Sequence, residues 1–263
     1  MATSRKLPPI TKRQRDILTF LYKFRFLNRI QIQALMRHKD KRLINAWLKD
    51  LREKQYVETK YDRTFPHNTK PAIYFCSLSA IAYFKTLDDT EVVNRRLYRD
   101  NARSNEFVSG CVLIGDMAIE LRQGRSLDTM YQLATASDYA DPISRAHFLT
   151  ESEVAPDAII VKDEHGEFSS YLIQLFPRNY PPHLQYAKVQ NYIDFYFSHD
   201  WEAMVALDFP LILFVLTSQA QLTKLKRFTY NLLDLEDEDE IEAFEVDFLL
   251  ASQVKRDGII KYL

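Results

Sequence analysis

Glycine and cysteine are scarce in this sequence of 263 residues. The 5 glycines exclude collagen-like and glycine-rich linker architectures. The 2 cysteines, Cys76 and Cys111, can form neither a disulfide framework nor a four-cysteine zinc site. Such a low cysteine content is typical of a protein from a reducing compartment, so we expect a cytoplasmic location.

Long hydrophobic runs are also lacking. Residues 1–16 contain no apolar core of the length found in signal peptides. The longest apolar run, at 209–216, is too short to span a bilayer and is typical of a buried strand. We therefore expect neither secretion nor a membrane partner. A hydrophobic content of 46% is sufficient for one large packed domain or two small ones.

The net charge of −1 conceals an asymmetry between the two parts of the chain. Residues 1–103 contain 23 Lys and Arg against 10 Asp and Glu, which makes this part strongly basic. Residues 104–263 contain 12 Lys and Arg against 26 Asp and Glu, which makes the rest strongly acidic. A basic first part indicates contact with a polyanion, which the acidic second part would repel.

The basic part has the pattern of three helices followed by a hairpin. Thr11, Asn28 and Asp40 each have the side chain of a helix N-cap and precede apolar residues at helical spacing. Alternating segments at 56–62 and 72–78 predict two strands joined by a turn-rich loop. This element order is that of a winged helix-turn-helix domain.

The predicted winged helix-turn-helix domain covers residues 1–90. Its third helix would enter the major groove, where Arg and Lys pair with guanine edges and Asn pairs with adenine. Basic residues of the first helix and polar residues at the hairpin tip would hold phosphates. The candidate DNA-binding residues are Lys12, Arg13, Arg15, Lys41, Arg42, Asn45, Lys49, Arg52, His67, Asn68 and Lys70. The alternative is a winged helix that mediates only protein contacts.

A helical connection is predicted over residues 91–125. Its first half is polar and basic, and it carries Arg95, Arg96, Arg99 and Arg103. These arginines either extend the DNA footprint or pair with the acidic part of the chain. The second half of the connection is apolar on most faces, so we expect it to be buried.

The last segment, residues 126–263, has the pattern of strands alternating with helices. Strands are predicted at 153–162, 168–176, 209–217 and 244–252, with helices at 184–197 and 219–233. The residues between the first two strands, 163–166, predict a hairpin turn. This order predicts a mixed sheet flanked by helices, and the chain as a whole is expected to be α+β.

The order of elements along most of the chain carries a family resemblance. The winged helix, the helical link, the run Val154-Ala155-Pro156-Asp157-Ala158, the hairpin, and a helix with Lys188 and Tyr192 together resemble the replication-relaxation family. The resemblance covers about residues 10–230. It implies a protein of plasmids and other mobile elements that is associated with replication or with relaxation and mobilisation of plasmid DNA. It also implies a restriction-endonuclease-like α/β fold for residues 126–263.

In that nuclease fold, carboxylates on neighbouring strands bind Mg²⁺ and a lysine assists the attacking water. By the resemblance, Asp157 matches the first carboxylate and Lys188 matches the lysine. Gln174 and Phe176 occupy the positions where the family's next strand has Glu-x-Asp, and Glu120 is a possible further carboxylate. Because two carboxylates are missing, we expect a domain without catalytic activity or bound metal. Mg²⁺ would be a cofactor only of an active nuclease.

These patterns together predict a DNA-binding protein of a plasmid or other mobile element that acts in replication, mobilisation or their regulation. Its expected partners are double-stranded DNA, replication or transfer proteins, and a second copy in a homodimer. Two alternatives stay open. One is a metal-dependent nuclease or nicking enzyme. The other is a transcriptional repressor with a sensing or dimerisation domain, in which the aromatic residues of 180–201 form either a partner surface or core.

Overall fold

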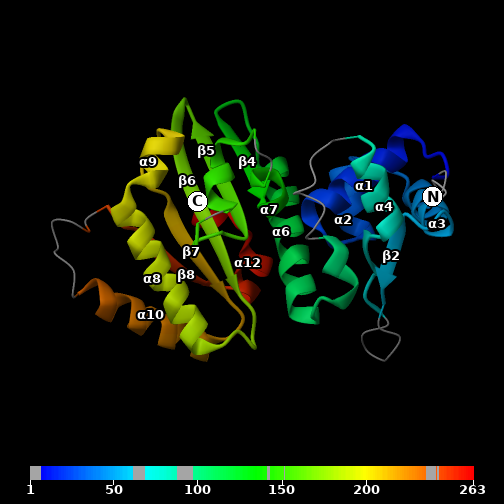
Figure 1. Ribbon diagram of the computed structural model, residues 1–263. Helices are drawn as coiled ribbons and strands as arrows, with labels where there is room; N and C mark the ends of the chain where they lie inside the picture. The colour runs from blue at the N-terminus through cyan, green and yellow to red at the C-terminus, as the bar shows by residue number, and fades with distance from the viewer. Residues whose placement is uncertain are drawn as a thin grey trace, which may run out of the picture. The chain divides into compact units, whose positions relative to one another are not determined.

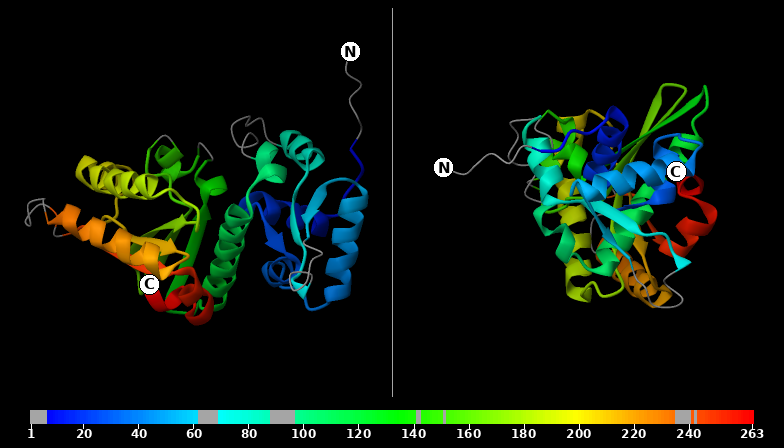
Figure 2. Two further views of the ribbon diagram at one scale, coloured as in Figure 1. Left: turned by 90° about the horizontal axis from the view of Figure 1, so that it is seen from below. Right: turned by 90° about the vertical axis from the view of Figure 1, so that its right-hand side faces the viewer.

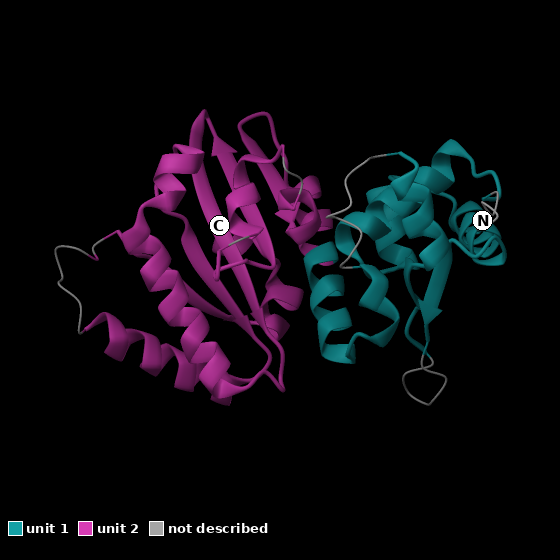
Figure 3. Ribbon diagram, viewed as in Figure 1, with its two compact units in different colours: residues 1–115 teal, residues 116–263 magenta. Residues whose placement is uncertain are grey.

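The structure, a computed structural model, describes residues 7–61, 69–87, 97–140, 143–150, 152–234, 241 and 243–263 (Figure 1). The chain divides into two compact units, Met1–Gly115 (unit 1) and Asp116–Leu263 (unit 2), as Figure 3 shows. The division falls inside helix α6 (Asn105–Gln123), within the predicted helical connection. Within the described ranges, every helix is too short or too polar to cross a membrane.

Unit 1 begins with three helices whose predicted caps are confirmed. The helices are α1 (Lys12–Phe24), α2 (Arg29–Leu35) and α3 (Lys41–Glu53). Thr11, Asn28 and Asp40 each accept a hydrogen bond from a backbone N–H of the following first turn, which satisfies a donor that lacks a partner within the helix. The apolar faces of the three helices form one core, which includes Ile17, Leu18, Leu21, Ile32, Leu35, Ile44, Leu48 and Leu51.

A small antiparallel sheet follows the three helices. Its strands are β1 (Leu27–Asn28), β2 (Val57–Lys60) and β3 (Ile73–Cys76), in the order β1-β3-β2. One face lies toward α1, where the Cys76 thiol reaches the Leu18 carbonyl oxygen at 4.0 Å. On the other face, Phe75 packs with Val108 and Cys111 of α6. Two further elements of unit 1 follow the sheet. They are α4 (Leu78–Lys85), whose N-cap is Ser77, and the 3₁₀ helix η2 (Leu97–Ala102).

Unit 2 is built on a five-stranded sheet. The strands are β4 (Thr129–Thr135), β5 (Ala158–Glu164), β6 (Glu167–Phe176), β7 (Leu211–Leu216) and β8 (Val246–Leu250). They lie in sequence order, with β4, β5 and β6 antiparallel and β6, β7 and β8 parallel. The predicted mixed sheet and α+β class are therefore confirmed.

The turn at 163–166 is confirmed and has a simple local cause. His165 and Gly166 connect β5 to β6 with φ angles of 56° and 90°. Positive φ at both central residues is the geometry that matches the twist of a two-residue hairpin. Asp163 stabilises the turn because its side chain accepts a 3.0 Å hydrogen bond from Gly166 N. This hairpin fixes the register in which Ala158 lies opposite Ile173.

Helices cover both faces of the five-stranded sheet (Figure 2). The helices α8 (Pro182–Ser198), α9 (Asp200–Val205) and α10 (Gln219–Leu233) lie on the face that presents Ile159, Leu172 and Phe214. The chain passes from β6 to β7 through α8 and α9, and from β7 to β8 through α10. Such helical crossovers return the chain to the same edge of the sheet, so β6, β7 and β8 are parallel. The opposite face is covered by the second half of α6 with α12 (Ala251–Asp257) and the 3₁₀ helix η4 (Ile260–Tyr262).

The aromatic residues of 180–201 belong to the core of unit 2. Tyr192 and Trp201 are almost completely buried, and Phe195 and Tyr196 are also buried. Of the two interpretations of this segment, the core is therefore the one that the structure bears out for these four side chains. Two short elements close this side of the unit, α7 (Ala136–Tyr139) and the 3₁₀ helix η3 (Arg145–Thr150).

Candidate nucleic-acid interface and carboxylate site

The outer face of α3 carries a basic stripe. Ile44, Leu48 and Leu51 hold the helix on the core, so the opposite side faces solvent. The predicted α3 contact residues are all exposed, namely Lys41, Arg42, Asn45, Lys49 and Arg52. Residues three and four apart lie above one another on a helix, so this spacing produces one continuous stripe. The exposed pair of Lys49 with Glu53, at 3.8 Å, is too solvated to cancel its charge.

A polar contact fixes α3 against α1. Asp50 of α3 accepts hydrogen bonds from Gln14 Nε2 of α1 and from Lys54 Nζ, the latter at 2.6 Å. The Lys54 hydrogen bond, with that of Gln14, lowers the pKa of Asp50 below its ordinary value. The candidate phosphate contacts Lys12, Arg13 and Arg15 are all exposed on α1. Because α1 and α3 are held together, their basic side chains keep a fixed spacing.

The turn between α2 and α3 is held by an aromatic contact. Arg37 has a positive φ of 51°, which turns the chain back toward α3. The His38 ring meets the Trp47 ring edge-on, with the centroids 5.1 Å apart. His38 Nδ1 also accepts a hydrogen bond from Asp40 N at 3.2 Å, just before α3 begins. This histidine therefore has a packing role that explains its position.

The hairpin residues are only partly described. Lys70 is exposed just before β3, as expected for a phosphate contact. His67 and Asn68, the other two predicted hairpin residues, lie outside the described residues, as do Arg95 and Arg96 of the predicted connection.

Asp157 in unit 2 lies directly before β5 and points toward the face covered by α8. Its Oδ2 accepts hydrogen bonds from Leu175 N at 2.7 Å and from Gln174 Nε2 at 2.9 Å. Burial raises the pKa of Asp157 to about 6, although the hydrogen bond from Leu175 and the charge of Lys188 act in the opposite direction. Its carboxylate is therefore tied to β6 by backbone and side chain together.

The residues around Asp157 form one connected group. Gln174 is buried, and its Oε1 accepts a 3.4 Å hydrogen bond from the buried Tyr192 hydroxyl on α8. Lys188, one turn earlier on α8, donates a 2.7 Å hydrogen bond to the Glu153 carbonyl oxygen. Burial lowers the pKa of Lys188, while the charges of Asp157 and Glu153 raise it. The structure thus brings Asp157, Gln174 and Lys188 together. Phe176 is part of the apolar core.

Glu120 does not join this group. Its two carboxylate oxygens accept hydrogen bonds from Ile259 N at 2.7 Å and Ile260 N at 3.1 Å, just after α12. These contacts lie on the face of the sheet opposite to Asp157. Tyr171 and Leu172 are neighbours on β6, so their side chains point to opposite faces. The Tyr171 hydroxyl donates a 2.6 Å hydrogen bond to the Leu263 carbonyl oxygen on the face where Glu120 lies. The expected further carboxylate therefore has a structural role, which is to satisfy backbone donors at the end of the chain.

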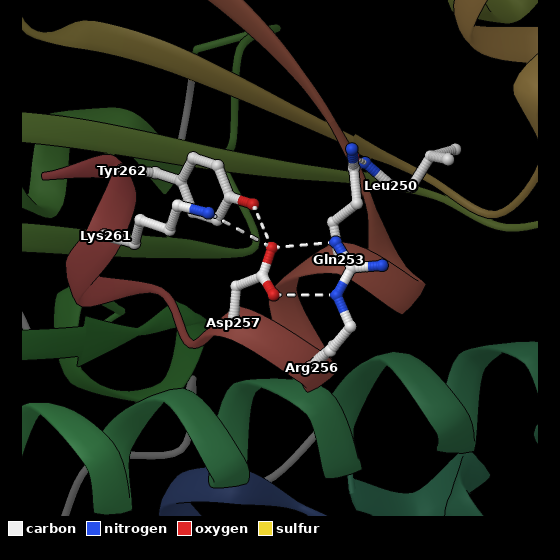
Figure 4. A network of polar contacts seen from close by, with 6 residues as sticks. All are labelled: Leu250, Gln253, Arg256, Asp257, Lys261 and Tyr262. Atoms are coloured by element: carbon white, nitrogen blue, oxygen red, sulfur yellow. Dashed lines mark hydrogen bonds and ion pairs between the residues drawn. The ribbon is translucent and has the colours of Figure 1, made fainter.

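Sequence reasoning missed the polar network that orders this end of the chain, shown in Figure 4. Asp257 accepts hydrogen bonds from Arg256 at 2.7 and 2.9 Å, from Tyr262 at 3.2 Å and from Lys261 at 3.4 Å. The Arg256 hydrogen bond, with those of Lys261 and Tyr262, holds the pKa of Asp257 well below its ordinary range. The network fixes the turn after α12, so that Ile259 and Ile260 present their N–H groups to Glu120.

The residues around Asp157 do not fit a resident Mg²⁺ ion. Among the residues that the structure describes, no three His, Cys, Asp or Glu side chains lie close enough together to hold a metal. Mg²⁺ prefers charged oxygen ligands, and the side chain that meets the Asp157 carboxylate is the neutral amide of Gln174. The amide oxygen of Gln174 faces Tyr192, and Phe176 offers no ligand. This arrangement satisfies its own polar atoms without a metal.

The two units place this chain among mixed α+β proteins that combine a basic helical unit with a mixed sheet. A model of the replication-relaxation family matches residues 18–206, and the chain belongs to this family. The resemblance seen in the sequence is thereby confirmed.

The chain is also similar to two structures of restriction endonuclease FokI, one of them bound to DNA. Sequence identity is 13% and 14%, and the TM-scores are 0.33 and 0.32. Each match covers 95% of this chain and 44% of the other, so this chain spans less than half the length of those proteins. No curated protein matched the sequence.

Proposed function

We propose that this chain is a DNA-binding protein that acts in the replication or mobilisation of a plasmid or other mobile element. Membership of the replication-relaxation family supports the role in replication or mobilisation. The exposed basic stripe of α3, with Lys41, Arg42, Asn45, Lys49 and Arg52, is the observation that carries the DNA contact. Such a stripe offers cations to phosphates and an amide to base edges.

The element order of unit 1 supports a winged helix-turn-helix. The helices α2 and α3 are joined by residues 36–40, and the antiparallel strands β2 and β3 follow as the hairpin. In this class of domain the second helix of the pair enters the major groove. That helix is α3, whose apolar side is buried and whose basic side is exposed.

The charge distribution favours unit 1 as the only DNA-binding unit. Residues 1–115 contain 23 Lys and Arg against 11 Asp and Glu, whereas residues 116–263 contain 12 against 25. Cations that replace condensed counterions provide much of the affinity for DNA, and an acidic surface opposes it. We assign unit 2 the role of a nuclease-like domain without catalysis, which binds replication or transfer proteins or a second copy of the chain.

Duplex binding measured by fluorescence anisotropy tests this proposal. The full chain should bind a labelled duplex, and the affinity should fall steeply as salt is added. Arg42→Ala with Lys49→Ala should weaken binding by about tenfold or more and reduce the salt slope by about 2. The control is Lys224→Ala with Arg227→Ala on α10, which removes the same charge from exposed positions of unit 2. Equal affinity of both double variants would overturn the assignment to α3.

Incubation with supercoiled plasmid and Mg²⁺ or Mn²⁺ tests the assignment of unit 2. The plasmid should stay supercoiled, because the amide of Gln174 occupies the position where the nuclease chemistry requires a second carboxylate. Nicking that disappears in Asp157→Ala would instead establish a metal-dependent nuclease.

A further inference from the structure

Unit 1 contains a groove on the side of its small sheet that faces α6. The groove has a volume of about 830 Å³ and lies between the β2–β3 hairpin and the beginning of α6. Its polar lining includes Lys60, Tyr61, Lys70, Asn105 and Ser109, and the described lining residues include no Asp or Glu. It is distinct from the α3 stripe, because α3 packs with α1 and α2 on the other face of this sheet.

Lys60 is held in a fixed position beside this groove. It lies opposite Ile73 in the β2–β3 register, on the sheet face that Phe75 presents to α6. Its Nζ donates a 2.7 Å hydrogen bond to the Arg103 carbonyl oxygen and lies 5.8 Å from the centroid of the Phe26 ring. An ammonium held in this way keeps further N–H donors for an anion and loses little conformational entropy when it binds one.

Three basic side chains lie close to the buried Asp100 behind the groove. Arg25 and Arg103 lie over the Phe107 ring, with their guanidinium carbons 4.6 and 4.8 Å from its centroid. Asp100 is completely buried and pairs with Arg25, and the charges of Arg103 and Lys60 also act on its carboxylate. Arg103 Nε is buried and has no hydrogen-bond partner in the part of the chain that the structure describes. Partial burial strengthens the field of these basic side chains at the groove.

The shape and lining of the groove select a single strand over a duplex. A volume of about 830 Å³ is that of a small-ligand pocket, whereas a B-form duplex receives a protein helix in its own groove. Tyr61 lines the groove with 49% of its surface exposed, so a base can reach this side chain from the groove. Cations that follow a backbone, combined with aromatic rings that stack on bases, are how proteins bind single strands.

We propose that this groove binds a short segment of single-stranded nucleic acid, with phosphates at Lys60 and Lys70 and a base on Tyr61. The inference goes beyond the duplex contact assigned to α3, and the two contacts use different faces of unit 1. A chain with both sites holds duplex and an adjoining single strand at the same time.

This inference is tested by measuring how the full chain binds a labelled oligothymidylate of about 15 nucleotides. This length is chosen because strand-binding grooves have site sizes of this order. Tyr61→Ala with Lys70→Gln should weaken strand binding by about tenfold or more, and Tyr61→Ala alone should leave duplex binding within about twofold, because Lys70 is also a candidate duplex contact. Both positions are exposed, so folding should be retained. The matched control is Tyr98→Ala with Lys85→Gln, a second exposed tyrosine and lysine pair of unit 1 that lies outside the groove, and it should bind as the wild type does.

The outcomes separate this inference from the function proposed for α3. Duplex binding without strand binding, or equal strand binding by both double variants, overturns the groove and leaves the α3 assignment intact. Loss of strand binding in Arg42→Ala with Lys49→Ala places the strand on α3 and also overturns it. A mononucleotide that competes as well as the oligonucleotide would identify a free nucleotide as the ligand instead. A wild-type chain that binds neither nucleic acid contradicts both proposals.

Discussion

Gln174 donates a hydrogen bond of 2.9 Å to the Asp157 carboxylate, where the family resemblance places a second carboxylate. Two carboxylates at this distance repel one another unless a metal or a proton lies between them. The amide converts that repulsion into an attraction, and Tyr192 completes the arrangement by donating to Gln174 Oε1. The amide of Gln174 therefore closes a hydrogen-bonded network between Asp157 and Tyr192.

Replacement of Asp157 by Asn should change how stability depends on pH. Burial raises the pKa of Asp157 from 3.8 to about 6, so the folded chain binds this proton more tightly than the unfolded chain. The wild-type free energy of unfolding should therefore lose a contribution as the pH rises from about 4 to about 6, by at most about 3 kcal/mol. Urea titrations at pH 4.5 and 7.5 should show that Asp157→Asn removes this loss. A variant with the pH profile of the wild type would contradict the assignment.

Replacement of Gln174 by Glu should create a metal requirement. The new carboxylate would lie within hydrogen-bond distance of Asp157 and repel it, so the variant should be less stable than the wild type without metal. Mg²⁺ should then raise the melting temperature of Gln174→Glu while that of the wild type stays constant. Thermal unfolding with and without MgCl₂ measures the difference. Gln174→Met, which adds no carboxylate, is the control and should not respond to Mg²⁺.

Removal of the Glu120 carboxylate should destabilise unit 2. Glu120 satisfies the backbone N–H groups of Ile259 and Ile260, and Glu120→Ala leaves both without that partner. A loss of about 1–3 kcal/mol in the free energy of unfolding is expected, with a smaller loss for Glu120→Gln, which retains one acceptor oxygen. Urea unfolding followed by circular dichroism measures both. If Glu120→Ala had the stability of the wild type, the carboxylate would not hold the end of the chain.

The pair of Arg25 and Asp100 predicts a larger effect in unit 1. Arg25 donates to both oxygens of the fully buried Asp100, and its loss in Arg25→Met leaves that carboxylate without its principal partner. Burial raises the pKa of Asp100 and Arg25 opposes this, so the variant should lose stability as the pH rises. About 3–5 kcal/mol is the expected loss near neutral pH. Asp100→Asn combined with Arg25→Met removes the buried charge and should recover part of it.

Local signals in the sequence were sufficient to predict most of the elements. The caps Thr11, Asn28 and Asp40 were recognisable because a short polar side chain before an apolar helical pattern has few other uses. The turn at His165 and Gly166 was recognisable because it separates two alternating segments. The helix predicted at 219–233 has the same bounds in the structure, where Ser218 is its cap.

Other elements had no local signal. The strand β4 was not predicted, because it lies at the edge of the sheet and exposes the apolar Met130, which interrupts the alternation of apolar and polar residues. The helix α12 was missed because a helix of seven residues has too little periodicity to stand out. Asp100 and Arg25 are 75 positions apart, and nothing in either local sequence indicates that they form a buried pair.

The sequence by itself determined the two-part charge, the order of helices and strands, and the family, because these depend on composition and on patterns within a few residues of one another. Tertiary structure alone decided which charged side chains meet. It brought Asp157 to Gln174 and Lys188, and it placed Glu120 on the opposite face of the sheet. Alternation along a strand assigns each side chain to a face, but only the packing of helices on those faces decides which partners it finds there.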